Sequence, residues 1–520
     1  MEWRSILGVC VVLLVGAACA PTDPLVREQA KKSPPKKPAI IVLPVLTTEE
    51  NDRRNKISRE VCSSCHVWPK PGVLNRKAWV EVLDKMKPWL GLEPIPDDMP
   101  EELHGLFPSE KVIDAVQWTE LKEYYLVNAP RDFPVVHAKF DGEAKLFEAV
   151  DAKAPSGAFY MTLRVEPKTG VIWAGWEGGG GDHGVFHGDA NGKWSEVLDW
   201  GGAPAQFRFT GKGVLAVMIG DLIPSNEAAG GLVRVEENKP VELMKFLRRP
   251  VDVLVEDFDG KEPEDFVLCE FGHLMGGITW FGHEGDHSER RSLLDQPGIL
   301  NAASADLNRD GHLDFAVLVG QAREGVFLFF GDGKGSFEPR AILPRHPSWG
   351  HSHLELVDIN GDRHPDLLIT NGDNGDLLEV PVKPYHGIRI HLNDGKGNFL
   401  EEKFFAQPGA YRALAQDFDG DGDMDIASIA YFADFKNSSE MALIYLRQEG
   451  PMEFKRLKMP GAQSGRWITM DAGDVDGDND VDLVLGAMNF GPGVGTVPIK
   501  TRRRWVRENL PVLILRNRTR

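Results

Sequence analysis

The chain has 520 residues, a formal net charge of −19 and 5 cysteines. An acidic balance of this size argues against nucleic acid as a partner. No segment reaches the roughly 18 consecutive apolar residues of a membrane-spanning helix. The sequence therefore predicts a mature protein that is either soluble or held at a membrane by an anchor.

Residues 1–19 have the composition of an export signal. Arg4 precedes an apolar run that is too short for a permanent span, and small residues follow it. The ending Gly16-Ala17-Ala18-Cys19 resembles a bacterial lipobox, with Gly16 where Leu is usual, so lipidation of Cys19 competes with ordinary cleavage after Ala20. We favour lipidation, with residues 20–50, rich in Pro and Lys, as an extended tether. This predicts export to the periplasm, or to the outer membrane or cell surface of a bacterium as a lipoprotein.

The next feature is the pentapeptide Cys62-Ser63-Ser64-Cys65-His66. C-x-x-C-H offers two thiols to the vinyl groups of a haem and an imidazole to its iron. A thioredoxin-like redox pair would sit at the head of a helix after a strand, and a structural zinc site would need a second Cys or His pair. A charged helical segment precedes the motif, and the sequence has no second C-x-x-C. The motif therefore predicts one covalent haem c on Cys62, Cys65 and His66.

Two amphipathic patterns follow, and they predict helices over 75–90 and, with Ser109 as N-cap, over 109–127. With the helix leading into Cys62, they make a small all-α cytochrome c domain over residues 51–130. The iron needs a sixth ligand, and a Met thioether is usual in electron transfer. Met86 lies seven residues after Trp79 on the helix face, whereas Met99 precedes Pro100 in a loop. We favour Met86.

Downstream, one nine-residue motif occurs in four copies, with oxygen-bearing side chains at positions 1, 3, 5 and 9. Such a loop wraps a hard cation, and Ca²⁺ accepts six to eight oxygens in flexible geometry. Strands flank these loops, and an Asp at position 9 replaces the Glu at position 12 of an EF-hand, so EF-hands are excluded. About four Ca²⁺ ions are expected. The predicted ligands are Asp306, Asn308, Asp310 and Asp314; Asp358, Asn360, Asp362 and Asp366; Asp417, Asp419, Asp421 and Asp425; and Asp474, Asp476, Asp478 and Asp482.

A fifth copy, residues 257–265, has Lys261 where a ligand belongs, and its ammonium would take the place of the cation. The five copies start 49 to 59 residues apart, which is the size of a propeller blade. Each loop is followed by short apolar strands and Gly-rich turns, so four antiparallel strands per repeat are expected. Two further units, 159–198 and 207–246, lack metal loops. The sequence therefore predicts a mainly β fold, a seven-bladed β-propeller over residues 131–520, closed by the segment 145–150 as the missing fourth strand of the last blade.

The D-x-[DN]-x-D-G-x-x-D loops resemble the FG-GAP repeats of integrin α-subunit propellers. Together with NGDNGD, KPYHGIRI, GAYRALAQDFDGDGD and GRWITMDAGDVDGD, the whole arrangement resembles bacterial FG-GAP/VCBS-repeat proteins that carry an N-terminal c-type haem domain. This resemblance covers nearly all of the mature chain. The biochemical activity of that family is undefined, so the resemblance implies architecture rather than function.

Residues before or at the start of the inner strands are expected to border the mouth of the channel opposite the calcium loops. They would hold an anionic or carbohydrate ligand. The main hypothesis is an exported haem protein that passes single electrons while the propeller docks a redox partner protein or a small-molecule or carbohydrate substrate. The alternatives are a catalytic propeller that passes electrons to the haem, and an adhesion or glycan-binding protein. The mouth residues are His351, His353, Asp373, Tyr385, His386, Tyr411, Arg412, Arg466, Trp467 and the segment 489–504.

Overall fold

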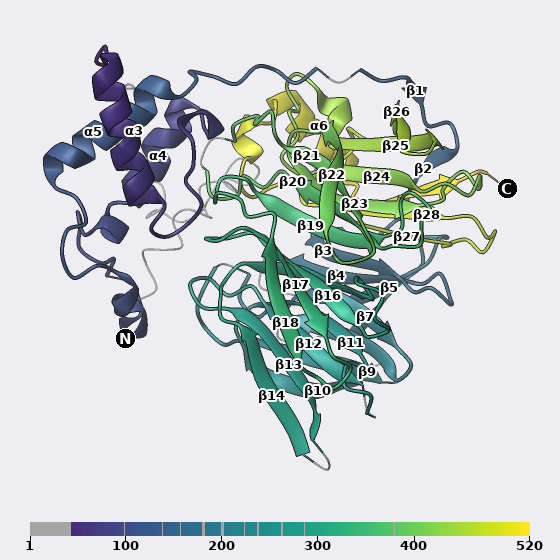
Figure 1. The fold of residues 1–520 in the computed structure, drawn as a ribbon. Coiled ribbons are helices and arrows are strands. Elements are labelled where there is room, and N and C mark those ends of the chain that lie inside the picture. Colours follow the sequence, from purple (N-terminus) through teal and green to yellow (C-terminus); the bar gives the residue numbers. More distant parts are fainter. Residues whose placement is uncertain are drawn as a thin grey trace, which may run out of the picture.

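The structure is a computed structural model that describes residues 43–519, except 98, 138, 157, 179–182, 199–201, 223, 237–238, 262–263, 285–286 and 378–379. The predicted export signal and most of the predicted tether lie outside these residues. The described chain forms a helical unit, residues 48–128, followed by a ring of sheets (Figure 1). Among the described helices, not one combines the length and apolar character needed to cross a bilayer.

The helical unit is built from three α-helices: α3 (Thr48–Cys62), α4 (Arg76–Lys85) and α5 (Ala115–Asn128). The Thr47 hydroxyl and the Glu50 carboxylate form a capping box that starts α3. Trp79 of α4 packs on Tyr125 of α5 with ring centroids 4.1 Å apart. Short 3₁₀ turns connect the helices: η1 (Pro71–Val73), η2 (Pro88–Leu90) and η3 (Glu101–Leu106).

Two predicted helix boundaries were wrong. The helix expected from Ser109 begins at Ala115, because the Asp114 carboxylate accepts the backbone N–H groups of Val116 and Gln117 and caps the helix there. The helix expected to reach residue 90 ends at Lys85, since Pro88 begins a separate 3₁₀ turn. Met86 is consequently the C-cap of α4 rather than an interior residue.

Seven sheets follow the helical unit. Each has four antiparallel strands, one of the sheets has a fifth, parallel strand at its edge, and six take their four antiparallel strands in sequence order. The first strands of the seven sheets contact one another in a closed cycle, so they line the centre of the ring. Blade I consists of β3 (Ala158–Val165), β4 (Ile172–Gly178), β5 (His183–Gly188) and β6 (Trp194–Leu198). Blade II consists of β7 (Pro204–Thr210), β8 (Gly213–Met218), β9 (Gly230–Glu236) and β10 (Lys239–Leu247). Blade III consists of β11 (Pro250–Glu256), β12 (Asp265–Glu270), β13 (Gly277–Glu284) and β14 (His287–Leu294).

The later blades carry the four predicted calcium loops. Blade IV consists of β15 (Ile299–Ala305), β16 (Asp314–Val319), β17 (Gly325–Gly331) and β18 (Phe337–Ile342), and blade V of β19 (His351–Val357), β20 (Asp366–Asn371), β21 (Gly387–Asn393) and β22 (Phe399–Ala406). Blade VI consists of β23 (Ala410–Gln416), β24 (Asp425–Ala430), β25 (Leu443–Gly450) and β26 (Glu453–Lys458). Blade VII contains β27 (Trp467–Gly473), β28 (Asp482–Ala487) and β29 (Val512–Asn517). The insertion between β24 and β25 contains η4 (Ser439–Ala442), and the one between β28 and β29 contains η5 (Val494–Thr496) and helix α6 (Ile499–Glu508).

The ring closes by the strand that the sequence predicted. Strand β2 (Phe147–Asp151) pairs antiparallel with β29, with Phe147 opposite Asn517, and so completes blade VII from the N-terminal side of the propeller. Phe147 is buried and packs edge-on against Phe418 and Tyr445 of blade VI. A second short strand, β1 (Gly142–Glu143), pairs parallel with β26 and was not foreseen.

We expect Phe147→Ala to lower the free energy of unfolding by about 3 to 4 kcal/mol, because it removes a buried aromatic side chain that joins the closing strand to blade VI. Denaturant titration measures this. Glu148→Ala is the control, since Glu148 is an exposed residue of the same strand and should cost less than about 1 kcal/mol. Equal costs for the two variants would contradict this role of Phe147.

Candidate functional site

The C-x-x-C-H motif lies where α3 ends. Cys62 is the last residue of α3, and Cys65 and His66 follow in the next turn. Both cysteines are free thiols, Cys62 partly buried and Cys65 exposed. Burial raises the pKa of the Cys62 thiol, and a helix C-terminus also disfavours a thiolate. This is the reverse of the helix N-terminal position that activates a catalytic redox pair.

His66 is oriented for metal ligation through Nε2. Its Nδ1 lies 3.0 Å from the carbonyl oxygen of Val67, so Nδ1 donates its proton there and Nε2 keeps its lone pair. The Tyr125 hydroxyl lies 3.4 Å from Cys62 Sγ and donates to the carbonyl of Pro69, which steadies the turn. Among the described residues, the groups of metal-ligating side chains with atoms within 4.8 Å of one another do not include Cys62, Cys65 and His66 together.

These residues fit a covalent haem: two unpaired thiols and an imidazole with one nitrogen available. Haem is also large and apolar, and the helical unit exposes several large hydrophobic residues that would suit such a group. Cys62 and Cys65 would hold the porphyrin and His66 the iron. Met86 and Met99 are both partly buried, and the sixth ligand stays a prediction. The exposed residues of the unit are Val67, Leu106, Val112 and Val116, and Val45 just before it is exposed too.

The helical unit rests on the insertion of blade V between β20 and β21. The Tyr385 hydroxyl donates to the carbonyl of Val73 at 2.8 Å, and Lys85 Nζ donates to the carbonyl of Asp376 at 2.7 Å. Leu377 is buried within the apolar core of the helical unit itself. The propeller therefore holds the helices through hydrogen bonds and a shared core.

All four predicted calcium loops join the first strand of a blade to the second, as expected from the sequence. The Asp at position 1 organises each loop: Asp358 accepts backbone N–H groups from Gly361, Asp362 and Arg363 at 2.8 to 3.1 Å. The fourth residue has a positive φ, 77° at Gly361, which favours Gly there. In the first loop one oxygen of Asp306, Oδ1, is buried without a hydrogen-bond partner among the described residues, as suits a cation ligand.

The Asp at position 9 ties the loop to the third strand of its blade. Asp314 accepts the N–H groups of Leu307 and Gly331, both at 2.9 Å. Asp366 and Asp482 repeat this pattern, and Asp425 instead accepts from Gln448 N and the Tyr445 hydroxyl. These carboxylates are fully buried.

The carboxylates converge in some loops and not in others. Oxygens of Asp417, Asp419 and Asp421 lie within 4.8 Å of one another, as do those of Asp474, Asp476 and Asp482. In the loops that begin at Asp306 and Asp358, the Asn at position 3 instead donates to the Asp at position 5, at 2.8 and 2.9 Å.

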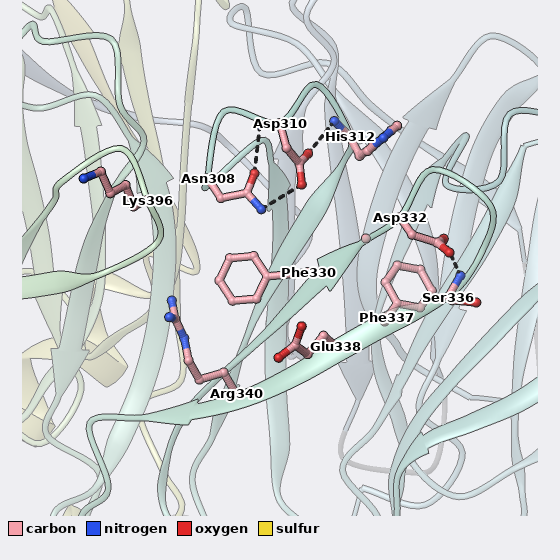
Figure 2. A pocket seen from close by; sticks show the side chains of 11 residues that line it. Asn308, Asp310, His312, Phe330, Asp332, Ser336, Phe337, Glu338, Arg340 and Lys396 are labelled. Carbon is pink, nitrogen blue, oxygen red and sulfur yellow. Dashed lines mark hydrogen bonds between the residues drawn. The ribbon is translucent and has the colours of Figure 1, made fainter.

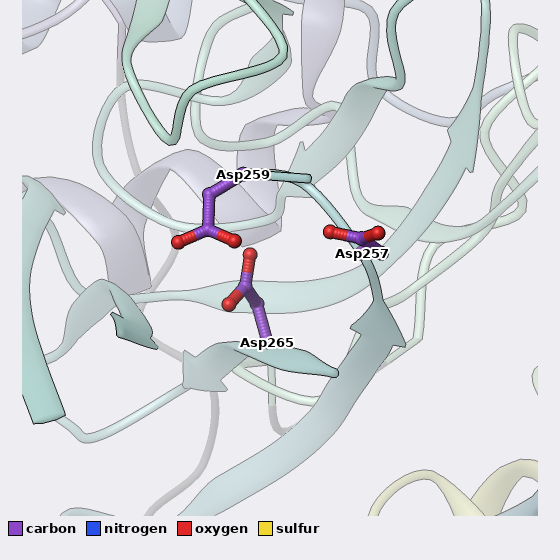
Figure 3. Close-up of side chains that lie close together, drawn as sticks. All are labelled: Asp257, Asp259 and Asp265. Carbon is purple, nitrogen blue, oxygen red and sulfur yellow. The ribbon is translucent and has the colours of Figure 1, made fainter. Parts of the chain in front are cut away.

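The carboxylates of the fifth loop also converge. Figure 3 shows Asp257, Asp259 and Asp265 facing one another, with oxygens within 4.8 Å. Lys261 Nζ lies 3.3 Å from Asp259 Oδ2, a distance that agrees with the predicted replacement of the cation by an ammonium.

Burial raises the pKa of the position-9 carboxyls. The pKa is about 6 for Asp314, Asp366 and Asp482 and about 7 for Asp425. Neighbouring loop carboxylates raise it further, while the backbone N–H groups lower it. A cation would remove this mutual repulsion, since it favours the ionised forms.

A groove of about 770 Å³ lies beside the first calcium loop (Figure 2). Asn308 and Asp310 line it together with Phe330 and Arg340, whose guanidinium lies 4.6 Å above the Phe330 ring. The groove is thus on the same side of the ring as the metal loops, and it contains two predicted calcium ligands.

Several expected mouth residues have structural roles. Arg466 is buried and donates to the carbonyls of Tyr431, Phe490 and Pro492, and Trp467 is buried in the core. Neither is available to a ligand. Tyr385 differs from these two residues, because its hydroxyl faces the helical unit and donates to the carbonyl of Val73.

Polar side chains on the inner strands bond to the next blade. Asn301 exchanges two hydrogen bonds with the backbone of Leu354, and Asp471 accepts from Val165 N and Arg164. Arg412 lies 3.9 Å from Asp471. These residues carry no sequence signal that separates them from ordinary strand positions.

A family model described as an FG-GAP-like repeat matches residues 306–369 and 417–485. The protein therefore contains FG-GAP repeats within a seven-bladed β-propeller. The chain is similar to the crystal structure of an ancestral GH74 enzyme, with 10% identity and a TM-score of 0.43, over 66% of this chain and 45% of that one. It is also similar to the WD40 β-propeller domain of Doa1, with 10% identity and a TM-score of 0.39, over 70% and 94%. No curated protein matches this chain.

In excess chelator, we expect the melting temperature to fall by about 5 °C or more as pH rises from 5 to 8. The folded pKa values of Asp314, Asp366, Asp425 and Asp482 lie above the unfolded value, so their stabilisation is present at low pH and is lost as pH rises through 6 to 7. Saturating Ca²⁺ should abolish the fall, because it binds the ionised loops of the folded state. Thermal melts with and without Ca²⁺ measure this. Identical pH profiles would count against the calcium sites.

Lys261→Asn should add one bound Ca²⁺ per chain, because it removes the ammonium from the cluster of Asp257, Asp259 and Asp265 and supplies an amide oxygen. Native mass spectrometry after calcium titration counts the ions. Lys396→Asn, at an exposed lysine in a turn of blade V, is the control and should leave the count unchanged. An unchanged count in Lys261→Asn would show that the fifth loop is not a latent site.

Proposed function

We propose that this protein is an exported c-type haem electron-transfer protein whose calcium-stabilised propeller docks a redox partner or substrate. The main support is the C-x-x-C-H turn, in which both cysteines are free thiols and His66, the next residue in the chain after Cys65, bonds to the backbone through Nδ1. Haem bound there would exchange single electrons between the ferric and ferrous states. The helical unit positions the motif, and Tyr125 holds its turn.

The propeller contributes a rigid platform in this proposal. Four loops with calcium-type spacing each lie between a first and a second strand, and their position-9 carboxylates tie them to the blade. Calcium would stabilise the ring by binding the folded state only. The export signal with Cys19 as lipid anchor belongs to this proposal, because cytochromes c mature outside the cytoplasm.

The test is the full-length protein made with a haem maturation system. We expect a covalent haem mass and reducible c-type absorption bands in the wild type, and loss of both in Cys62→Ala/Cys65→Ala. Cys269→Ala is the matched control, because Cys269 is buried in blade III, away from the motif, and should keep the haem. Absence of the haem mass in the wild type would falsify the proposal.

The same sample separates the alternatives. Haem reduction on adding sugars, alcohols or amines would make the propeller catalytic. Polysaccharide binding with the same affinity in the oxidised and reduced states of the haem would favour an adhesion protein. Met86→Ala and Met99→Ala decide the sixth ligand, since loss of the Met-ligand absorption band identifies the residue that binds the iron.

A further inference from the structure

The propeller presents an aromatic cluster to the segment that follows the C-x-x-C-H motif. Trp349 and Tyr385 stack with centroids 5.0 Å apart and an interplanar angle of 11°. His346 packs edge-on against both rings, at 5.8 and 6.0 Å. The Tyr385 hydroxyl binds the carbonyl of Val73, so this cluster lies against the chain just beyond the motif. We name His346, Trp349 and Tyr385 the aromatic platform.

Within the platform, His346 is the residue that has His66 of the motif among its electrostatic neighbours. It is 8% exposed, and its Nδ1 has no hydrogen-bond partner among the described residues. Burial lowers the pKa of His346 to about 4, and the neighbouring Lys383, His66 and Arg345 lower it further. His346 is therefore a buried imidazole near His66 with one ring nitrogen that has no partner among the described residues.

The platform also carries positive charge. The guanidinium groups of Arg345 and Arg389 lie 4.8 and 4.6 Å from the Trp349 ring. Arg389 is tied to Asn371 and Tyr385 and is part of the blade. The Arg345 guanidinium donates a hydrogen bond to the carbonyl of the adjacent Pro344, at 3.1 Å. Replacing Arg345 therefore removes a charge, one hydrogen bond to an adjacent residue and the contact with the Trp349 ring.

Resting on the proposed haem function, we propose that the propeller completes the haem site: the aromatic platform forms its wall on the side of blade V, and His346 is the wall residue that contacts the haem or its ligand His66. The wall then tunes the midpoint potential, because burial and nearby charge are among the means by which a protein sets it.

The direction of each effect follows from charge. Ferric haem carries one more positive charge than ferrous haem. Removing the Arg345 guanidinium should therefore favour the ferric form and make the potential more negative. Replacing the polar imidazole of His346 by an apolar ring should disfavour the charged ferric form and make the potential more positive.

The experiment is a redox titration of the full-length holoprotein for wild type, His346→Phe and Arg345→Gln, with electron paramagnetic resonance of the ferric state. We expect a positive shift for His346→Phe, a negative shift for Arg345→Gln and altered resonance positions for His346→Phe. His187→Phe is the matched control, because His187 packs edge-on against Trp173 at 4.0 Å on blade I. It should leave both readouts unchanged.

Unchanged potentials in both His346→Phe and Arg345→Gln, with haem still covalently bound, overturn the wall assignment and leave the proposed function standing. An equal shift in His187→Phe also overturns it, because the effect would not be local. If His346→Phe does not fold, Arg345→Gln decides. Absence of haem from the wild type is the separate outcome that removes the proposed function itself.

Discussion

The ring depends on buried polar groups that connect each loop to its own blade and to the next. Asp314 binds the backbone of Leu307 and Gly331 within blade IV. The side-chain amide of Asn393 in blade V then donates to the carbonyl of Leu307. Gln448 and Asn517 repeat this bond to Ile359 and Phe418 of the preceding blades. Because a buried unpaired amide or carboxylate is costly, this chain of bonds favours one register and one ring.

Calcium-type loops and ring geometry are therefore linked. Each loop lies between the first two strands of a blade, and its second residue is buried. In the loops of blades IV, V and VI, the neighbouring blade also donates to the carbonyl of that residue. A change in the charge of a loop would therefore alter the hydrogen bonds between neighbouring blades. The closing strand β2 extends this network to the N-terminal side of the propeller, next to the segment that leads back to the helical unit.

Local sequence patterns were sufficient for much of this. The spacing of Asp residues predicted the loops and their place after the first strand, and the strand patterns of two further units without metal loops completed the count of seven blades. A loop motif and a strand are both recognised from neighbouring residues. The closing segment was predictable because blade VII lacks a fourth strand. Helix ends were less predictable: Ser109 and Asp114 are both acceptable N-caps, and only the backbone geometry selects Asp114. Among the candidate site residues, Arg466 and Trp467 could not be told from ligand-binding residues, since a buried Arg that binds backbone carbonyls has no distinct sequence pattern.

By itself, the sequence determined the metal-loop spacing, the blade count, the closing strand and the C-x-x-C-H motif, since each is a short-range pattern. Only the tertiary structure decided where the helical unit lies. The bond between Tyr385 and Val73 joins residues 312 positions apart, and Leu377 enters a core formed by a segment about three hundred residues earlier. Such contacts depend on the shapes of two finished surfaces, and neither segment records its partner locally.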